Sequence, residues 1–496
     1  MTDFRDMNAL GCNVQRGYAI ATQRVTISDA CVCCGLCVDA CPTQVFEYSD
    51  GLNEMAQPNS HRCVWPECED DTAHKLKDRM PCVSVCPVDA IQVFGNPSYH
   101  ALGDRRWHND LLTATWHEAR TGHVPNDVEY RVGDSGGGFD AMQIELRTTN
   151  YESANADLSL QLNRRGTGQQ IVLPYPWYGG GMSYGSIGIR TMLARAIAAT
   201  ELGTFSSTGE GGFPDELAPY HDHMITQVAT GLFGVREETL QWARVLEFKY
   251  AQGAKPGLGG HLLADKVTPS VAELREAVPW RSLFSPFPFH SVYSVEDHKK
   301  HVDWLRSINP RALISVKVST PEDIDMVAVG SYYAGAHIVH IDGGYGGTGA
   351  APEIAKKNIA MPIEYAIRRA HTFLVKEGIR DEIVLMASGG IRTPHDIAKA
   401  IALGADGCVI GTAELVALGC VRCGNCESGR GCPRGIATTD KILGQLIDAD
   451  RGARQIVNMY HAWAEELRAI LARLGMKSVR ELRGQTDVLS YSEAMP

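Results

Sequence analysis

Short apolar runs alternate with amphipathic stretches through the second half of the chain. The runs at 312–317, 337–341, 383–386 and 407–410 are rich in β-branched residues, whereas the segments 189–199, 295–306, 363–377 and 394–403 have helical periodicity. Apolar strands of this length, separated by helices, indicate βαβ units and a buried parallel sheet. The pattern therefore predicts an α/β fold.

About 300 residues of this pattern fit a (β/α)8 TIM barrel, with a doubly wound open sheet as the alternative. In a barrel the active site lies on the loops that follow the strands. Glycines gather directly after the apolar runs, at Gly343, Gly344, Gly389, Gly390 and Gly411, the last followed by Thr412. Exposed backbone N–H groups in such turns can bind a phosphate.

The cysteines are clustered. Of fifteen, ten lie before residue 87 and four lie between residues 420 and 432, while Cys408 stands alone in an apolar run. A disulfide framework would spread along a small secreted chain, and the N-terminus shows no secretory signal. Clusters in such a chain favour metal sites, and we expect Cys408 to be a core residue.

The first cluster has the spacing C-x2-C-x2-C-x3-C-P of bacterial ferredoxins, and a second half with the same Cys-Pro ending follows it. Zinc also takes C-x2-C pairs, but it requires neither the Cys-Pro endings nor the doubled motif. We therefore predict two [4Fe–4S] clusters, with Cys12 and Cys33 left over as packing or surface thiols. One cluster takes Cys31, Cys34, Cys37 and Cys86, and the other takes Cys41, Cys63, Cys68 and Cys82.

These patterns predict a division of the chain into four parts. Residues 1–100 form a ferredoxin-like domain and 101–165 form a connector of strands and loops. Residues 166–445 form the barrel, and 446–496 form a helical extension that covers the barrel or supports an oligomer. Within and before this extension we expect helices at 440–447 and 453–474.

Composition excludes several classes of function. Apolar residues make up 44% and charged residues 21%, and no run approaches the eighteen apolar residues of a membrane span. The net charge is −11 and no basic block is present, which argues against nucleic acid as a partner. We therefore expect a cytoplasmic protein.

One glycine motif matches a dinucleotide-binding fingerprint but lacks the context that such a site requires. Gly344, Gly346 and Gly349 match the dinucleotide fingerprint G-x-G-x-x-G, but Ala350-Ala351-Pro352 opens no clean helix and no acidic residue closes a strand about 20 residues later. We expect no nicotinamide site at this position, so electrons must arrive from a partner.

Several longer motifs occur in a characteristic order. They are Gly181-Met-Ser-Tyr-Gly-Ser-Ile187, Ser207-Thr-Gly-Glu-Gly-Gly212, Gln252-Gly-Ala-Lys-Pro-Gly257, Ile314-Ser-Val-Lys317, the segment 342–352, Gly411-Thr412-Ala413 and Cys432-Pro-Arg-Gly-Ile-Ala-Thr438. Together they closely resemble the FMN-binding synthase domain of glutamate synthase over roughly residues 165–445. With ferredoxin motifs in front and no amidotransferase region, the layout resembles the short, archaeal-type enzyme.

The resemblance implies an oxidoreductase that aminates 2-oxoglutarate. In that family FMN takes electrons from an iron–sulfur cluster and reduces the imine formed from 2-oxoglutarate and ammonia. Met182, Ser183 and Tyr184 would border the flavin, and Lys317 would sit near its N1–C2 edge, where a fixed ammonium stabilises the reduced form. The phosphate would be held by Gly343, Gly344, Gly389, Gly390, Gly411 and Thr412.

The resemblance also suggests a substrate site and a third cluster. Lys249 and Lys255 are the cations for a dicarboxylate, Gln252 is a neutral donor, and Glu210 would orient one of these groups or handle a proton. Cys420, Cys426 and Cys432 occupy the positions of the family's [3Fe–4S] ligands. Cys423 is extra, and a fourth thiolate would complete a [4Fe–4S] cube.

Two departures leave the substrate open. The family's segment Pro-Pro-Pro-His-His-Asp appears here as Pro286-Phe-Pro-Phe-His-Ser291, and Leu258 stands where glutaminase-fused enzymes carry a glutamate. A related 2-oxo acid, an N-alkylglutamate product or a non-aminating electron-transfer subunit remain alternatives. The expected partners are a ferredoxin or flavoprotein NAD(P)H reductase and a glutaminase or amine-supplying subunit, in an oligomer or hetero-complex.

Overall fold

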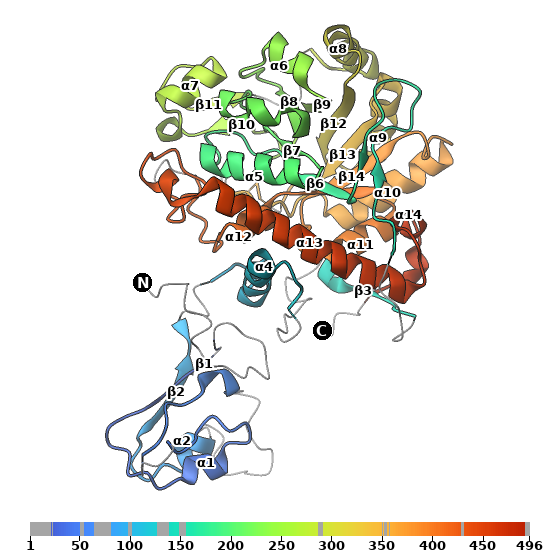
Figure 1. Cartoon of the computed structure of the whole chain (residues 1–496). Helices are drawn as coiled ribbons and strands as arrows, with labels where there is room; N and C mark the ends of the chain where they lie inside the picture. Colours follow the sequence, from blue (N-terminus) through green and yellow to red (C-terminus); the bar gives the residue numbers. More distant parts are fainter. Residues whose placement is uncertain are drawn as a thin grey trace. The chain divides into compact units, whose positions relative to one another are not determined.

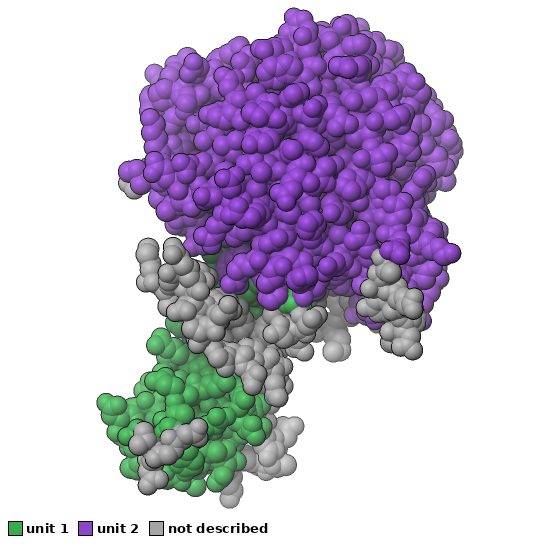
Figure 2. Space-filling view, in the orientation of Figure 1, with its two compact units in different colours: residues 1–114, 125–132, 421–423 green, residues 115–124, 133–420, 424–496 purple. Residues whose placement is uncertain are grey.

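The computed structural model describes residues 21, 23–49, 54–63, 81–97, 102–125, 138–147, 155–285, 291–349, 351, 355–356, 358–427 and 431–491 (Figure 1). The chain forms two compact units, coloured separately in Figure 2. Unit 1 comprises residues 1–114, 125–132 and 421–423, and unit 2 comprises residues 115–124, 133–420 and 424–496.

Unit 1 is built on an antiparallel strand pair. Strand β1 (Gln23–Ile27) pairs with β2 (Ile91–Gly95) along its whole length, from Gln23 opposite Gly95 to Ile27 opposite Ile91. Val25, Cys37, Val45, Phe46 and Ile91 form its buried core. Four further thiols, Cys41, Cys63, Cys82 and Cys86, pack against this core.

The same turn occurs twice in unit 1. Helix α1 (Leu36–Ala40) leads into Cys41-Pro42, and α2 (Pro81–Ser84) leads into Cys86-Pro87. Three residues after each cysteine the backbone is left-handed, at Gln44 (φ 56°) and Asp89 (φ 49°). The next N–H group then donates to the cysteine sulfur, at 3.4 Å for Cys41 and 3.2 Å for Cys86. The internal repeat predicted from the sequence is confirmed as a structural repeat.

The predicted connector contains a helix that the sequence pattern did not reveal. We expected strands and loops in 101–165, but α4 spans Asn109–Thr121 and is followed by the short η3 (Gly138–Ala141). Another short helix, η2 (Ser60–Arg62), precedes α2 in unit 1. The threonines of α4 have low helix propensity, yet the Thr113 hydroxyl donates to the Asp110 carbonyl and Leu112 is fully buried. Tertiary burial overrides local propensity here.

Unit 2 is a closed barrel of parallel strands. In chain order the eight strands of its sheet are β6 (Trp177–Gly179), β7 (Ser206–Ser207), β8 (Met224–Ala229), β9 (Val245–Lys249), β12 (Leu313–Ser319), β13 (Ile338–Asp342), β14 (Val384–Ser388) and β15 (Gly407–Ile410). Strand β15 pairs with β6, and a bridge between Gly181 and Ser207 joins β6 to β7. Gly179 N also donates to Phe205 O at 2.8 Å. Because both edges are joined, the TIM barrel is confirmed and the open sheet is excluded.

Helices surround the barrel in the expected alternation (Figure 1). They are α5 (Ile189–Glu201), η4 (Asp215–His223), α6 (Glu237–Trp242), α8 (Val295–Ile308), α9 (Ile324–Ala334), α10 (Ile363–Lys376), α11 (Pro394–Leu403) and α12 (Thr412–Ala417). The long helix α13 (Ala449–Leu474) packs on α5, α11 and α12. The segment expected to be helical at 440–447 instead carries only the short η6 (Leu443–Leu446).

Smaller elements decorate the two ends of the barrel. Between β9 and α8 lie β10 (Gly259–Leu262), η5 (Ala264–Lys266), α7 (Pro269–Arg275) and β11 (Leu283–Ser285). At the amino ends of the strands, β4 (Leu160–Gln161) and β5 (Val172–Leu173) form a hairpin. Its Leu160 and Leu173 pack against the apolar side chains at that end of the barrel interior. Near the C-terminus lie α14 (Val479–Leu482), η7 (Thr486–Val488) and β16 (Leu489–Tyr491), the last paired with β3 (Met142–Ile144).

The barrel interior changes from apolar to charged along its axis. Side chains alternate along each strand, so every second residue points inward. The lowest inward positions include Val245, Leu313, Ile338 and Val384. Two residues further along three of these strands come Glu247, Ser315 and His340, and two residues beyond those come Lys249, Lys317 and Asp342. The charged layer therefore lies at the carboxyl ends of the strands.

Among the described helices, none combines the length and apolar character needed to cross a lipid bilayer.

Candidate active site

Glu247 anchors a polar network in the middle of the barrel. Its carboxylate accepts hydrogen bonds from Gln227 Nε2 at 2.7 Å, from Ser315 Oγ at 2.9 Å and from His340 Nδ1 at 3.1 Å. Burial alone would raise the pKa of Glu247, but His340, together with Lys317 and the Gln227 amide, lowers it to about 2. The carboxylate is therefore ionised and fully hydrogen-bonded inside the barrel.

The network continues upward from His340 to Asp342. His340 Nε2 lies 2.7 Å from Ser388 Oγ, and Ser388 Oγ donates to Asp342 Oδ1 at 2.5 Å. Ser388 Oγ has one proton and donates it to Asp342, so it accepts a hydrogen bond from His340 Nε2. The Glu247 carboxylate can only accept, so His340 Nδ1 donates to it. The hydrogen-bond partners thus assign a proton to each ring nitrogen.

Asp342 connects this network to Lys317. Its Oδ2 accepts from Gly253 N at 3.0 Å and lies 3.5 Å from Lys317 Nζ. Burial would raise the pKa of Asp342, but the Lys317 ammonium and His340 hold it below its usual value. Lys317 was predicted to be functional rather than a solvated lysine, and its side chain is buried, with 8% exposed.

A second charged group forms beside the first. Lys249 Nζ donates to Glu210 Oε1 at 2.5 Å and to Gln252 Oε1 at 2.8 Å, so three of the predicted site residues are in direct contact. Burial lowers the pKa of Lys249, and the neighbouring ammonium of Lys317 on the adjacent strand lowers it further. Burial would raise the pKa of Glu210, but Lys249 outweighs it and lowers that pKa.

Two further cations complete the group. Burial lowers the pKa of Lys255 to about 8, and its Nζ reaches the carbonyl of His261 at 3.4 Å. Arg275, at the end of α7, donates from Nη2 to Ser183 Oγ and to Tyr184 O, both at 2.9 Å. Arg275 therefore fixes the loop after β6 that carries Met182, Ser183 and Tyr184.

The charges in this layer do not balance. The cations are Lys249, Lys255, Arg275 and Lys317, and the carboxylates are Glu210 and Asp342. All six residues are buried, which leaves an excess of two positive charges in a low-dielectric environment. Glu210 Oε2 and Arg275 Nε are also buried without a partner in the described part of the chain. A dianionic ligand with polar groups fits this donor set.

The glycines after the strands bring several loops into backbone contact. Gly253, Gly343 and Gly389 follow β9, β13 and β14, and a Cβ on Gly253 or Gly389 would clash with the Gly343 backbone. Gly389 also has φ 87°, which favours glycine. By contrast, a Cβ at Gly411 would meet nothing within 4 Å, and one at Gly390 would have only ordinary contacts from 3.5 Å. The space at Gly390 and Gly411 fits a phosphate group.

Gly344 and Thr412, which were also predicted to hold the phosphate, differ in how deeply they are buried. Gly344 is buried and its N–H donates to Met361 O at 3.0 Å, whereas Thr412 is half-buried at the start of α12. The segment with the G-x-G-x-x-G match opens no helix within its described residues, and α10 begins only at Ile363. Ala350 and Pro352, where the sequence opens no clean helix, lie outside the described residues.

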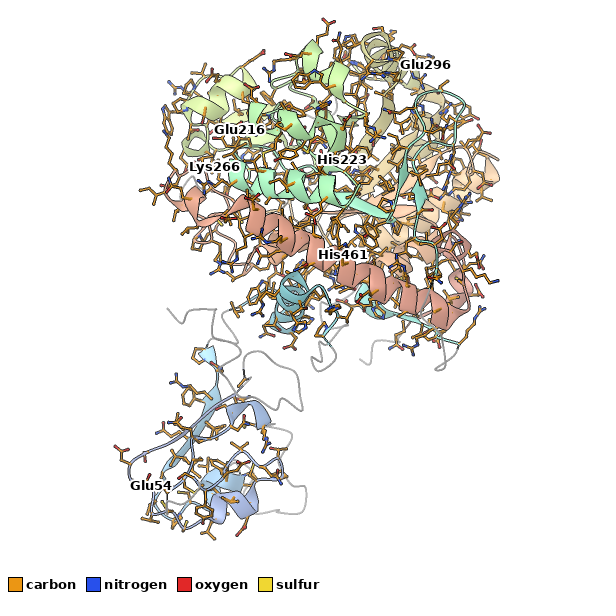
Figure 3. The ribbon with its side chains drawn as sticks, in the orientation of Figure 1. Glu54, Glu216, His223, Lys266, Glu296 and His461 are labelled. Atoms are coloured by element: carbon orange, nitrogen blue, oxygen red, sulfur yellow. The ribbon has the colours of Figure 1, made fainter. Side chains whose placement is uncertain are left out.

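The C-terminal cysteines of unit 2 lie near a buried lysine. Lys266, labelled in Figure 3, donates from Nζ to the carbonyl oxygens of Cys426 at 2.5 Å and Ala437 at 3.1 Å. Cys432 is buried, while Cys420 and Cys426 are half-buried. Gly349 of the β13 loop packs against Cys426, since a Cβ there would lie 2.7 Å from its sulfur. Cys423 is exposed and belongs to the segment 421–423 of unit 1.

The N-terminal cysteines are brought together only in part by the described residues. Cys31 and Cys34 lie close enough to Cys37 to raise its pKa, after burial, which is the larger cause. Cys12 and Cys68 lie outside the described residues, as do Phe287 and Phe289 of the altered segment. Among the described side chains, no three His, Cys, Asp or Glu residues converge on a single metal position. Cys408 is fully buried in β15, as predicted.

Several residues of this site were not predicted from the sequence. Glu247 and His340 lie inside apolar runs, and only strand register shows that they meet. Arg275 and Lys266 belong to the excursion between β9 and α8, which carries no periodic signal. The alternation of a charged residue with apolar ones in Val245-Leu-Glu-Phe-Lys249 was the available clue to Glu247.

Replacing Glu247 by Gln is expected to destabilise unit 2 by about 3–5 kcal/mol at pH 7, because it removes one partner of a buried charged network. The folded-state pKa is depressed, so this contribution is present above the unfolded value of 4.5. It should be lost as pH falls toward 2. Urea unfolding followed by tryptophan fluorescence measures both effects.

The matched control is Glu238→Gln, at an exposed position on α6. It should leave the urea midpoint unchanged at every pH. Equal midpoints for Glu247→Gln and the parent protein at pH 7 would show that the network does not stabilise the barrel.

Comparison with known proteins identifies the family. The family model described as a conserved region in glutamate synthase matches residues 142–477. The archaeal-type glutamate synthase (NADPH) of Thermotoga sp. (strain RQ2) is 35% identical over 485 residues, covering 92% of each chain. The archaeal glutamate synthase (NADPH) of Archaeoglobus fulgidus is 33% identical over 493 residues, covering 93% of this chain and 92% of the relative. That of Methanocaldococcus jannaschii is 45% identical over 309 residues, covering 62% of this chain and 60% of the relative.

Solved structures show more remote likenesses. A flavocytochrome b2 variant with sulfite bound is 16% identical, with a TM-score of 0.45 over 79% of this chain and 83% of that chain. Mandelate oxidase with benzoyl-formic acid is 16% identical, with a TM-score of 0.44 over 79% of this chain and 95% of that chain. At these scores neither bears on activity. The match over residues 142–477 and the near full-length relatives show that the chain belongs to the glutamate synthase family.

Proposed function

We propose that this protein is an iron–sulfur flavoenzyme that reductively aminates 2-oxoglutarate, or a related 2-oxo acid, to the corresponding amino acid. The observation that carries the proposal is the buried cluster of four cations and two carboxylates at the carboxyl ends of the barrel strands. Such a cluster, in a member of the glutamate synthase family, supports a site that binds a dicarboxylate beside a flavin.

FMN, when bound, supplies hydride transfer to the imine carbon. Lys317 is the group that we assign to the N1–C2 edge of the flavin, because an ammonium fixed in a buried site favours negative charge there. Asp342 holds this lysine through Oδ2, which also accepts from the Gly253 N–H. Met182, Ser183 and Tyr184 border the ring, and Arg275 holds their loop through Ser183.

The phosphate of FMN is assigned to the turns that follow three neighbouring strands. A Cβ at Gly411 would meet nothing within 4 Å and one at Gly390 nothing nearer than 3.5 Å, so both glycines border open space. Thr412 follows Gly411 at the start of α12, and Gly389 adopts the left-handed backbone of the same turn as Gly390. Gly343 and Gly344 are both buried, and we assign them to the packing of this turn against the barrel. Backbone N–H groups in such turns suit a phosphate.

The substrate dicarboxylate is assigned to the excess positive charge. The buried cationic groups of Lys255, Arg275 and Lys249 would bind the substrate carboxylates. Glu210 and Gln252 both contact Lys249 Nζ, so they hold its ammonium in one orientation. Glu210 stabilises the ammonium form of Lys249, which can then donate a proton to the substrate nitrogen and become a neutral amine.

Electrons reach the flavin through iron–sulfur clusters in this proposal. Cys31, Cys34, Cys37 and Cys86 would hold one [4Fe–4S] cluster, and Cys41, Cys63, Cys68 and Cys82 would hold the other. The repeated turn supports this, since each N–H···S bond at Cys41 and Cys86 stabilises a thiolate. Cys420, Cys426 and Cys432 would hold a third cluster, [3Fe–4S] or, with Cys423, [4Fe–4S].

The proposal also requires partners. A ferredoxin or a flavoprotein NAD(P)H reductase would supply electrons in the cytoplasm, and ammonia would arrive free or from a glutaminase or amine-supplying subunit. The relatives in Thermotoga and Archaeoglobus carry NADPH in their names, which supports a reductase that takes electrons from that cofactor.

The direct test is an anaerobic half-reaction. The protein is reduced with dithionite and mixed with 2-oxoglutarate and ammonium, while flavin absorbance and glutamate are recorded. Reoxidation with glutamate formation is expected. Reoxidation only by a protein partner would instead identify an electron-transfer subunit, and reoxidation only with methylammonium would identify an N-alkylglutamate synthase.

Lys317→Met is expected to slow flavin reduction at least a hundredfold, because it removes the charge assigned to the flavin edge. The iron–sulfur absorbance should remain intact. Stopped-flow reduction measures the rate, and Lys441→Met, at an exposed position, is the control. Unchanged kinetics in Lys317→Met would remove this lysine from the mechanism.

Cys34→Ser is expected to lose one of the two N-terminal clusters, and with it about four iron atoms per chain. Iron analysis and low-temperature EPR of the dithionite-reduced protein measure the loss. The adjacent Cys33→Ser provides a matched control, because we assign Cys33 no ligand role. An iron count that is the same in both variants would refute the ligand assignment.

A further inference from the structure

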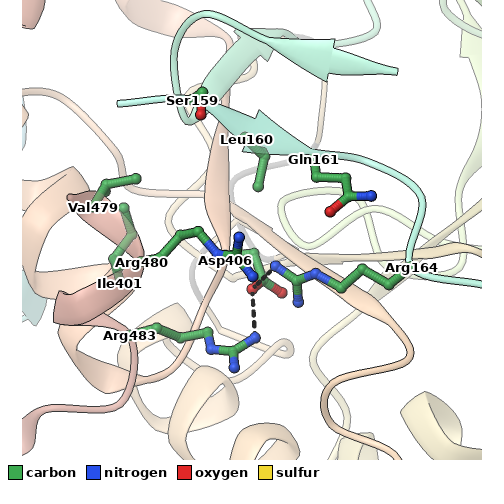
Figure 4. A pocket seen from close by; sticks show the side chains of 9 residues that line it. All are labelled: Ser159, Leu160, Gln161, Arg164, Ile401, Asp406, Val479, Arg480 and Arg483. Carbon is green, nitrogen blue, oxygen red and sulfur yellow. Dashed lines mark hydrogen bonds and ion pairs between the residues drawn. The ribbon is translucent and has the colours of Figure 1, made fainter. Parts of the chain in front are cut away.

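A cavity of about 200 Å³ lies at the opposite end of the barrel from the candidate active site. Its walls come from β4 and the residues after it, from α11, from the start of β15 and from α14 (Figure 4). Leu160, Ile401 and Val479 form an apolar side. Arg164, Arg480 and Arg483 form a cationic side around Asp406.

Asp406 gathers an unusual number of guanidinium groups. Its Oδ1 accepts from Arg164 Nη2 at 2.7 Å and from Arg483 Nη1 at 3.1 Å, as Figure 4 shows. Its Oδ2 accepts from Arg380 Nη2 at 2.9 Å and from Leu385 N at 2.8 Å. Burial would raise the pKa of Asp406, but Arg380 and Arg164 hold it well below its usual range. The carboxylate is therefore charged at neutral pH, and each of its oxygens accepts two hydrogen bonds.

The cations around the cavity exceed the acids that pair with them. Arg164, Arg380, Arg480 and Arg483 carry four positive charges. Asp406 is one acid partner, and Asp381, which pairs with Arg483 at 2.5 Å, is the other. Asp381 is 84% exposed, so solvent screens its charge. Four guanidinium groups and two carboxylates thus leave an excess of two positive charges, and the charge on the exposed Arg480 is screened by solvent as well.

Donors on both sides of the cavity also lack acceptors. The Arg164 side chain is only 9% exposed, and its Nε is buried with no hydrogen-bond partner among the described residues. Arg480 is exposed at α14, and within the described ranges its guanidinium has neither a hydrogen bond nor an ion pair. Arg164 Nε is closed off from the cavity, so the donor that an acceptor in the cavity can reach is the Arg480 guanidinium.

We propose that this cavity binds a small oxyanion, either phosphate or the carboxylate of a short-chain acid. The oxyanion accepts from Arg480, and its charge offsets the excess of positive charge that the arginines leave around Asp406. The apolar side formed by Leu160, Ile401 and Val479 accommodates a short hydrocarbon chain when the ligand is a carboxylic acid.

Acidic residues close to the cavity do not supply the missing acceptor. Asp157 accepts from both the N–H and the hydroxyl of Ser159, at 2.9 and 3.0 Å. Glu481 accepts from Lys477 N and from the Ser478 hydroxyl, each at 3.4 Å. Both carboxylates therefore have partners of their own. The bound oxyanion would join α14 to the barrel, because Arg480 belongs to α14 and Arg164 precedes β5.

The test is isothermal titration of the full-length, FMN-loaded protein with sodium phosphate and with sodium butyrate at constant ionic strength. Sodium chloride is the reference titrant. Arg480→Gln removes a donor that has no structural partner, so the variant should fold, and it is expected to weaken binding about tenfold. Arg454→Gln, at an exposed position of α13, is the matched control and should bind like the parent protein.

Saturable binding of phosphate alone would identify an inorganic anion site, and tighter binding of butyrate would identify a carboxylic acid site. Both results support the proposal if Arg480→Gln weakens the binding and amide hydrogen exchange of α14 slows with ligand. The proposal is overturned if neither anion binds more tightly than chloride, or if binding persists unchanged in Arg480→Gln.

Discussion

The Asp342 carboxylate holds the charged interior of the barrel together. One oxygen accepts from Ser388 and the other lies between the Gly253 N–H and Lys317. Through Ser388 it is linked to His340 and Glu247, deeper in the barrel. Without this carboxylate, Lys317 would be a buried ammonium beside Lys249, which carries the same charge on the next strand. Such an arrangement is costly unless each charge has a partner.

This constraint explains why the site is built as it is. Parallel strands in a closed barrel place their carboxyl ends in one ring, so residues distant in sequence become neighbours. The lower layers consist mostly of apolar side chains and of the hydrogen-bonded network around Glu247. The uppermost layer is the one in which buried cations outnumber buried carboxylates among the described residues. Active sites commonly retain such locally unfavourable features for binding and catalysis.

Local patterns predicted much of the fold. The strand at 407–410 and the helix at 394–403 were predicted with the observed bounds, because an apolar β-branched run and a Thr-Pro helix start are strong local signals. Helix α4 was missed since its threonine-rich sequence has low propensity and depends on tertiary burial. At 440–447 the short apolar run suggested a helix, but only a 3₁₀ turn forms there.

The candidate site was predictable where motifs carry it. The resemblance pointed to Lys249, Gln252 and Glu210, and the structure brings these three side chains into contact. Glu247, His340 and Arg275 were not predicted, because their roles depend on strand register and on an excursion that has no periodic pattern. The cysteine ligand sets remain assignments from spacing, supported by the repeated turn at Cys41 and Cys86.

The most direct measurement is the cofactor content of the purified, anaerobically prepared protein. Absorbance, FMN extraction, and iron and acid-labile sulfide analysis should give one FMN and at least two iron–sulfur clusters per chain. A colourless protein that lacks flavin and sulfide, and that does not acquire them on reconstitution, would contradict the account.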